Sequence, residues 1–145
     1  MADTPKHSVS VAGIVVDDQD RVLVIQRRDN NRWEPPGGVL ELDETPDEGA
    51  RREVLEETGV RVVVERLTGV YKNMSKGIVA LVFLCRPEIG IPVTTDESRD
   101  ARWITLNEVD LSMSPAFSVR VRDAFSDEVS VRSHDGHDLL GALYG

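Results

Sequence analysis

The chain has 145 residues, of which 40% are apolar and 30% are charged. This length suits one domain that buries about two-thirds of the surface of its unfolded chain, so we expect a single domain over residues 1–145. The 17 basic and 26 acidic side chains give a net charge of −9, which argues against binding to the phosphate backbone of long nucleic acid. A small phosphorylated ligand stays compatible with this charge, because a divalent cation reverses the local sign of an acidic pocket.

Cysteine content and hydropathy predict the compartment. The single cysteine, Cys85, cannot form an internal disulfide, and its apolar neighbours favour a small buried side chain in a reducing compartment. No apolar run approaches the ~20 residues that span a bilayer, and the first residues lack the apolar core of a signal peptide. We therefore expect a cytoplasmic protein with no membrane partner.

The N-terminal part is predicted to begin with two strands. Apolar and small residues alternate over 9–15, turn-forming residues follow at 17–20, and a second β-branched run covers 21–27. Two such runs around a short turn are typical of an antiparallel hairpin. Two prolines and two glycines between 32 and 38 predict a shaped loop without strand pairing.

A helix is predicted over 46–58, with both ends set by capping residues. Thr45 is the expected N-cap, Pro46 takes the first helical position, and Glu48 completes a capping box. Gly59 supplies the left-handed residue that ends the helix.

The remaining elements complete a layered domain. Residues 60–71 and 77–85 predict an antiparallel strand pair, 101–105 a short strand, and Ser114 the N-cap of a second helix. The residues of that helix expected on its core face are Phe117, Val121, Ala124 and Phe125. This order of strands and helices predicts an α+β or α/β/α layered fold.

Two histidines near the C-terminus, His134 and His137, flank an Asp-Gly pair at 135–136. A second metal site is one interpretation of this cluster. Because Asp-Gly lies between apolar runs at 129–132 and 139–143, we favour a turn with two exposed histidines.

Three carboxylates share one face of the predicted helix. At 100° per residue, Glu53, Glu56 and Glu57 fall within an arc of roughly 100°. Arg52 can pair with Glu56, whereas Glu53 and Glu57 have no cation at helical spacing. Two interpretations remain open: a site for a hard cation such as Mg²⁺, Mn²⁺ or Ca²⁺, and an acidic surface exposed to solvent.

The spacing around this helix resembles the signature of the Nudix hydrolases. Gly38, five residues, Glu44, seven residues and the segment 52–60 fill every defined position of that 23-residue box. The resemblance implies an α/β/α sandwich with a mixed, largely antiparallel sheet between helices. The implied reaction is hydrolysis of a nucleoside diphosphate linked to another group, in which water attacks one phosphorus with one to three divalent ions, Mg²⁺ or as a substitute Mn²⁺.

Roles within the box follow from the resemblance. It implies that Glu56 and Glu57 are the main metal ligands and that Glu53 is a further ligand or the base that activates water. Arg52 would orient the glutamates, with Glu44 as its partner, which suits a guanidinium that binds carboxylates in a fork.

Further metal contacts are expected outside the helix. The turn at Gly37 and Gly38 is expected to expose a backbone carbonyl to the metal. Relatives often recruit a carboxylate from a later loop, and Glu97 is our choice among the acidic residues of 96–100. The alternative is a solvated acidic loop.

The candidate substrate residues lie outside the box. Arg27 and Arg28 would meet phosphates or would only offset the acidity, and Trp33 would stack on a base or pack beneath the proline loop. The other pocket candidates, chosen for stacking and hydrogen bonding, are Tyr71, Lys72, Asn73 and Lys76.

The sequence thus predicts a pyrophosphohydrolase acting on a small nucleotide, with a nucleoside triphosphate or its oxidised form as the expected substrate. The alternatives are an ADP-sugar or dinucleoside polyphosphate hydrolase, a Nudix-fold module that senses a nucleotide without cleaving it, and an acidic Ca²⁺-binding or interaction protein. The oligomeric state is left open, with a homodimer as one option.

Overall fold

The computed structural model describes residues 3–141 and contains two β-sheets and three helices in that range. The elements are, in order, β1 (Ser8–Val15), β2 (Val22–Arg27), β3 (Trp33–Glu34), β4 (Gly37–Val39), α1 (Pro46–Thr58), β5 (Arg61–Asn73), β6 (Ile78–Ile89), β7 (Ser98–Ile104), α2 (Leu106–Ser112), α3 (Pro115–Asp123), β8 (Ser130–His134) and β9 (Leu139–Leu140). Within the same range, no helix is both long and apolar enough to cross a membrane.

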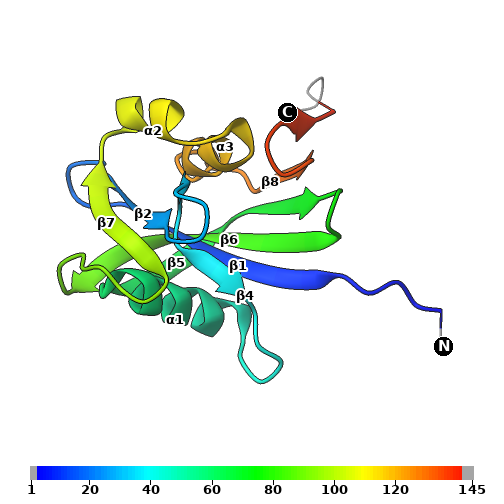
Figure 1. Cartoon of the computed structure of the whole chain (residues 1–145), viewed down its shortest axis with the longest axis horizontal. Helices are drawn as coiled ribbons and strands as arrows, with labels where there is room; N and C mark the ends of the chain where they lie inside the picture. The colour runs from blue at the N-terminus through cyan, green and yellow to red at the C-terminus, as the bar shows by residue number, and fades with distance from the viewer. Residues whose placement is uncertain (1–2, 142–145) are drawn as a thin grey trace.

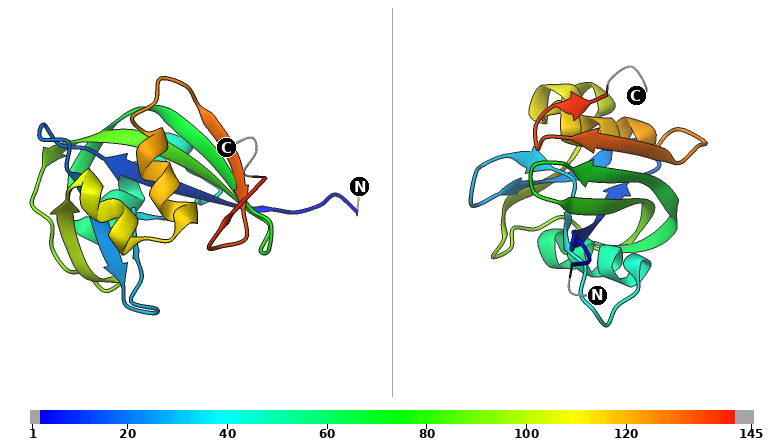
Figure 2. Two further views of the ribbon diagram at one scale, coloured as in Figure 1. Left: turned by 90° about the horizontal axis from the view of Figure 1, so that it is seen from above. Right: turned by 90° about the vertical axis from the view of Figure 1, so that its right-hand side faces the viewer.

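The larger sheet has the strand order β4-β1-β6-β5-β8-β9, and the smaller one has β3-β2-β7. Only the pairs β1–β6 and β5–β8 are parallel among the strand pairs described, so the sheet structure is mixed and largely antiparallel. Figures 1 and 2 show α1 on one side of the strands and α2 and α3 on the opposite side. The predicted α/β/α sandwich is therefore confirmed.

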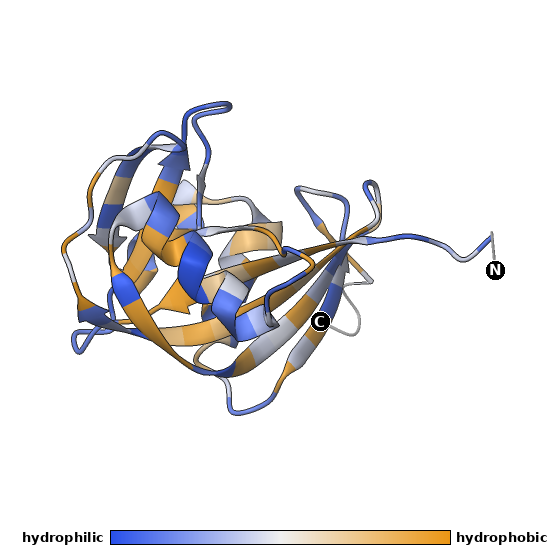
Figure 3. Ribbon diagram, turned by 90° about the horizontal axis from the view of Figure 1, so that it is seen from below, coloured by the Kyte–Doolittle hydropathy of each residue, from blue (hydrophilic) through white to orange (hydrophobic). Residues whose placement is uncertain are grey.

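The core forms two apolar clusters, one on each side of the larger sheet. The cluster on the α1 side includes Val15, Val54 and the buried Cys85. The cluster on the α3 side includes Tyr71 and Val121. In Figure 3 the strands between the helical layers are largely hydrophobic, whereas the connecting loops are mostly hydrophilic.

The predicted helix boundaries are confirmed in detail. The Thr45 hydroxyl accepts from the Glu48 N–H, the Glu48 carboxylate accepts from the Thr45 N–H, and α1 runs from Pro46 to Thr58. Gly59 has a left-handed φ of 80°, and its N–H donates to the Leu55 carbonyl at 2.9 Å. The antiparallel β5–β6 pair, strand β7 and the Ser114 N-cap of α3 are confirmed as well.

The predicted hairpin of the first two strands is wrong. β1 pairs with β4 and β6, β2 pairs with β3 and β7, and the two share only an isolated bridge between Val16 and Val22. Residues 22–25 are fully buried. A fully buried strand can be stabilised by pairing with any of several neighbouring strands, so the spacing of turns along the chain does not determine its partner. The loop prediction for 32–38 is wrong too, because β3 and β4 flank the proline pair and join the two sheets.

Three smaller predictions also need correction. α2 was not predicted, because seven residues carry little periodic signal. Phe125 follows the end of α3 and is 44% exposed, so it is not a core residue. The turn at 135–136 is confirmed, but His134 is only 2% exposed, since β8 pairs with β5 beneath α3. Residues 142–143 of the apolar run at 139–143 lie outside the described range.

The contact between α1 and β1 depends on Gly13. A Cβ at this position would lie 2.8 Å from Val54 Cγ2 on α1. We expect Gly13→Ala to lower the free energy of unfolding by about 1–3 kcal/mol through overpacking. Val54→Ala should cost a comparable amount by leaving a cavity, and the double variant should lose clearly less than the sum, because each change makes room for the other. Urea denaturation of the four proteins measures this, and strictly additive losses would contradict the contact.

Candidate functional site

An acidic cleft of about 1060 Å³ opens between α1, β4, the end of β2 and the loop before β7. Its polar lining residues are Arg27, Arg28, Asp29, Glu41, Asp43, Arg52, Glu53, Glu56, Glu57, Asp96 and Glu97. Four elements that are distant in sequence therefore place their charged side chains around one cavity.

Two of the α1 carboxylates are buried against the glycines of β4. Glu57 is 3% exposed, and its Oε1 accepts from the Gly37 N–H at 2.6 Å. Glu53 is 7% exposed, and a Cβ on Gly38 would lie 2.6 Å from its Oε1. Only glycine at 38 lets the backbone approach this carboxylate so closely.

Arg52 holds the other glutamates of the cleft in place. Its guanidinium donates to both oxygens of Glu44, at 2.7 and 2.9 Å, and also to Glu53 at 2.9 Å and Glu56 at 3.2 Å. These hydrogen bonds lower the pKa of Glu44 to about 2 and raise the pKa of Arg52. The expectation that Glu53 has no local cation was wrong, because the guanidinium of the adjacent residue Arg52 donates a hydrogen bond to its carboxylate.

Glu97 completes a cluster of three carboxylates. One oxygen each from Glu53, Glu57 and Glu97 lies within 4.8 Å of the others. Arg28 holds the Glu97 loop, since its N–H donates to the Glu97 carbonyl at 3.3 Å and its Nε to the Thr95 carbonyl at 2.9 Å. The tertiary fold thus brings to the helix the one loop carboxylate that the sequence analysis selected.

The electrostatics of this cluster suit a divalent cation. Burial and the charges of Glu53, Glu97 and Glu34 raise the pKa of Glu57 to about 8, although the Gly37 N–H opposes the shift. Burial also raises the pKa of Glu53, against the effect of Arg52. Three converging carboxylates with hard oxygen atoms are ligands that Mg²⁺ or Mn²⁺ accepts. Glu56 stands apart from the cluster, with a half-exposed side chain held by Arg52.

The predicted phosphate and base residues lie at the edges of the cleft. Arg27 lines it but is already paired with Asp29 at 2.8 Å and with Glu34 at 3.1 Å. Trp33 is half-buried against the core, and the Arg102 guanidinium lies 4.9 Å from its ring. Trp33 thus packs against the core and also lines a second cavity, and its stacking on a base stays a prediction.

The second cavity, here called the α3 cavity, has a volume of about 1080 Å³ and lies between the larger sheet and α3. Asn73 and Lys76 line it, as predicted candidates, whereas Lys72 lines neither cavity. Tyr71 is fully buried in its wall, and its hydroxyl donates to Asp123 at 2.7 Å.

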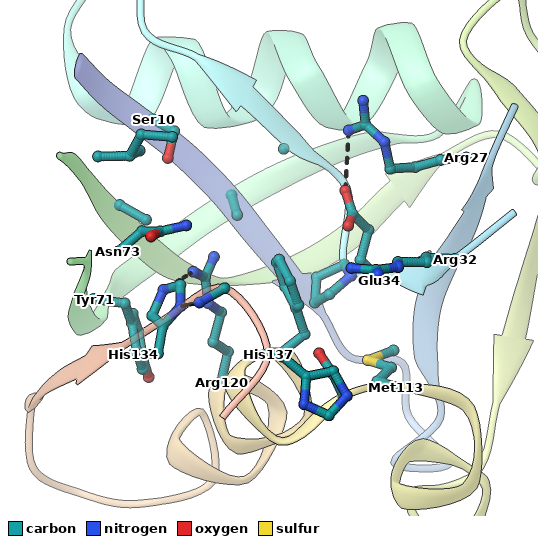
Figure 4. Close-up of a pocket in the computed structure, with 18 of the residues that line it drawn as sticks. Ser10, Arg27, Arg32, Glu34, Tyr71, Asn73, Met113, Arg120, His134 and His137 are labelled. Atoms are coloured by element: carbon teal, nitrogen blue, oxygen red, sulfur yellow. Dashed lines mark hydrogen bonds and ion pairs between the residues drawn. The ribbon is translucent and has the colours of Figure 1, made fainter. Parts of the chain in front are cut away.

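Sequence analysis missed several polar and aromatic residues of the α3 cavity, namely Glu34, Phe117, Arg120, His134 and His137. Figure 4 labels each of them except Phe117. Apolar periodicity identifies the core face of α3 and gives no role to Arg120; the available signal was an arginine three residues after Phe117, on the same side of the helix. His134 was assigned to an exposed turn, and its location at the end of a strand was not recognised.

Comparisons with known proteins identify relatives. The NUDIX domain family model matches residues 6–125. A MutT-like protein from Streptomyces ambofaciens is 55% identical over 139 residues, which cover 95% of this chain and 90% of the relative. A putative 8-oxo-dGTP diphosphatase from Bacillus subtilis is 37% identical over 60 residues, covering 41% of this chain and 40% of the relative. The crystal structure of an ADP-ribose pyrophosphatase from Streptococcus suis is similar in fold, with a TM-score of 0.73 at 19% identity, covering 87% of this chain and 99% of that one.

The raised pKa of Glu57 predicts a specific pH dependence of stability without divalent cations. Between its ordinary value of 4.5 and about 8, the folded protein keeps a proton that the unfolded chain releases. The free energy of unfolding therefore falls as pH rises through this window, by up to ~1.4 kcal/mol per pH unit. Glu57→Gln removes this component, so the variant should gain stability relative to the parent from pH 5 to pH 8.

Urea denaturation in EDTA at pH 5, 6.5 and 8 measures this difference. Glu88→Gln, at an exposed position on β6 that lines neither cavity, is the matched control and should show no such trend. A constant difference between Glu57→Gln and the parent across the three pH values would contradict the assignment.

Proposed function

The chain belongs to the Nudix hydrolase family, whose model matches residues 6–125, and on this premise we propose that it cleaves the pyrophosphate linkage of a small nucleotide with the help of Mg²⁺ or Mn²⁺. The observation that carries the proposal is the cluster of Glu53, Glu57 and Glu97, whose carboxylate oxygens converge within 4.8 Å in an acidic cleft. An exposed acidic surface would leave these side chains apart and hydrated, whereas Glu53 and Glu57 are buried.

In this proposal Glu53, Glu57 and Glu97 hold the cation, and Glu56 adds a ligand at the more open side of the cleft. A bound divalent cation neutralises phosphate charge and lowers the pKa of a bound water. Glu53 serves as ligand or takes the proton of the attacking water, because its second oxygen is free of the Arg52 contact. The backbone of Gly37 and Gly38 approaches the cluster closely enough for a carbonyl to join the ligands.

Arg52 acts as a positioning residue. Its fork on Glu44 fixes the guanidinium, and the remaining N–H groups fix the rotamers of Glu53 and Glu56. Such preorganisation matters because phosphoryl transfer depends on positioning and charge neutralisation more than on covalent chemistry. Arg28 positions the Glu97 loop in the same way.

The substrate proposed is a nucleoside triphosphate or its oxidised form. Its phosphates would meet the cations and the ends of Arg27 and Arg28, while its base would enter the α3 cavity beside Trp33, Asn73 and Lys76. The two cavities share Arg27, Asp29, Gly37, Gly38 and Val39, so one molecule can reach both. The name of the Bacillus subtilis relative supports this substrate.

A second candidate is hydrolysis of ADP-ribose or a similar ADP-sugar. The name of a relative favours it, since an ADP-ribose pyrophosphatase from Methanocaldococcus jannaschii is 31% identical over 109 residues, which cover 70% of this chain and 64% of the relative. We also keep two predictions: a single domain, which rests on chain length, and a cytoplasmic location, which rests on the single buried cysteine, Cys85. The homodimer stays an untested option.

Hydrolysis of a nucleotide panel tests the proposed function. The purified protein is incubated with Mg²⁺ and each of the nucleoside triphosphates, 8-oxo-dGTP, ADP-ribose and a dinucleoside polyphosphate, and the nucleotide products are separated by anion-exchange chromatography. This readout is needed because hydrolysis of ADP-ribose gives AMP and ribose 5-phosphate and releases neither phosphate nor pyrophosphate. Pyrophosphate release is measured in addition for the triphosphates. Turnover of a triphosphate with release of pyrophosphate supports the first candidate, and preferred turnover of ADP-ribose supports the second. Tight binding without any turnover would instead indicate a nucleotide-sensing module.

Two variants separate the roles of the α1 carboxylates. Glu57→Gln should lower kcat/KM by about 100-fold or more, because it removes a buried metal ligand while keeping the acceptor for the Gly37 N–H. Glu56→Gln should lose less, since its side chain is half-exposed and outside the cluster. EDTA should abolish activity without unfolding the protein. The control Glu88→Gln should match the parent, and full activity of Glu57→Gln would refute the assigned site.

A further inference from the structure

Arg120, on α3, presents a buried guanidinium to the α3 cavity. The residue is 7% exposed, and its guanidinium carbon lies 4.9 Å from the ring centre of Tyr71 and 4.7 Å from that of Phe117. Contact with two rings fixes the position of the guanidinium, and the cation–π interactions stabilise part of its charge. The rings do not accept hydrogen bonds from the N–H groups, which point outward in the plane of the guanidinium. The N–H groups therefore still need acceptors.

Within residues 3–141, Arg120 has no hydrogen-bonded acceptor that explains its burial. Its Nε is buried without a partner, and its one polar neighbour within range is His134 Nε2, at 3.4 Å. The Tyr71 hydroxyl is engaged with Asp123, and Glu34 is paired with Arg27. Burying a charged donor without an acceptor lowers the free energy of unfolding. Stability therefore does not explain why an arginine occupies this position.

The His134 contact does not supply the missing acceptor. The Gly136 N–H donates to His134 Nδ1 at 3.0 Å, so Nδ1 carries no proton. In the neutral ring the proton is then on Nε2, and burial together with Arg120 lowers the pKa of His134 and favours that neutral ring. Nε2–H and the guanidinium are therefore two donors side by side.

Asn73 adds a third donor on the same face. Its Oδ1 accepts from the N–H groups of Ser75 at 3.0 Å and Lys76 at 3.2 Å, which leaves its amide NH₂ for the cavity. Asn73 and His134 are register partners on the parallel strands β5 and β8, so their side chains share one face. Figure 4 shows the Asn73 amide nitrogen turned toward Arg120 and His134, with Glu34 and Arg27 on the opposite side of the cavity.

We propose that Arg120, His134 and Asn73 form a donor cluster that selects the carbonyl edge of a nucleobase, so that guanine and uracil are preferred to adenine and cytosine. This inference rests on the proposed function, because it assigns the base of the nucleotide to the α3 cavity. Guanine offers two adjacent acceptors, O6 and N7, where adenine has an amino group beside N7. Adenine and cytosine would place an amino group against the cluster. Because both sides would then be donors, no hydrogen bond could form.

A base suits this cavity better than a phosphate group. The lining includes the partly buried rings of Trp33 and Phe117, with Ala12 and Ala80 of the sheet, and aromatic and apolar surfaces stack on bases without sequence preference. The phosphates have their own place beside the carboxylate cluster, in the connected acidic cleft. The donor cluster then supplies the discrimination that stacking lacks.

Nuclear magnetic resonance titration of the ¹⁵N-labelled full chain tests the proposal without catalysis. The ligands are dGMP against dAMP and dUMP against dCMP, pairs of equal size, in EDTA, so that a failure of hydrolysis does not affect the result. The parent should bind dGMP and dUMP at least tenfold more tightly than dAMP and dCMP. The Gly136 amide and the Asn73 side-chain amide should shift on binding.

Arg120→Met should weaken binding of dGMP and dUMP at least tenfold and change binding of dAMP and dCMP less than threefold. Arg120→Lys, which keeps a donor, should restore part of the preference. The matched control is Arg122→Met, since Arg122 lies two residues along α3, lines neither cavity and pairs with Asp110. That variant should keep the preference of the parent.

Stability separates a recognition role from a structural one. Because Arg120 is buried without an acceptor, ligand-free Arg120→Met should melt at the same temperature as the parent or higher. Equal weakening of all four nucleotides would mean that Arg120 binds phosphate and would overturn the proposal. So would an equal affinity of the parent for the four, a preference that survives Arg120→Met, or the absence of any shift with all four ligands.

Discussion

The central constraint in this protein is the burial of like charges on the inner face of α1. Glu53 and Glu57 are almost completely withdrawn from solvent, one turn apart, and Glu97 joins them from another part of the chain. Burial and mutual repulsion both disfavour three ionised carboxylates at this distance. Arg52 offsets part of the charge on one side, and a divalent cation is the partner whose charge and hard character match the rest. The fold therefore holds an electrostatically unfavourable arrangement, which the proposed binding of a divalent cation would explain.

The surrounding structure is organised to hold the carboxylates there. The capping box at Thr45 and the left-handed Gly59 define the two ends of α1, and the close contact between Gly13 and Val54 packs the helix against β1. Gly37 and Gly38 then let β4 approach the carboxylates more closely than any side chain would allow. Stability gained in the apolar clusters on both sides of the sheet offsets the cost of a strained electrostatic site.

The two faces of the larger sheet carry chemically different cavities. On the α1 face, carboxylates and Arg52 provide an acidic cleft suited to cations and phosphates. On the α3 face, donors of Arg120, His134 and Asn73 meet aromatic walls in a cavity that shares its rim with that cleft. Within residues 3–141, each face has groups that lack a full set of protein partners, carboxylates on one face and donors on the other. In the function that we propose, a nucleotide with its cations would complement both sets, and the two connected cavities would form one binding site.

The sequence alone determined what depends on local spacing. Helix α1, its caps and its carboxylate face follow from residues within one or two turns of each other, and the glycine before Glu44 belongs to the same short pattern. Tertiary structure decided everything that requires a choice of neighbour. The sequence of a buried strand such as β2 does not specify which strand it pairs with. The position of Glu97 depends on a loop held by Arg28. Arg120 faces a cavity only because α3 crosses β5 and β8. Hydrogen bonds and burial act through space, so spacing along the chain cannot reveal them.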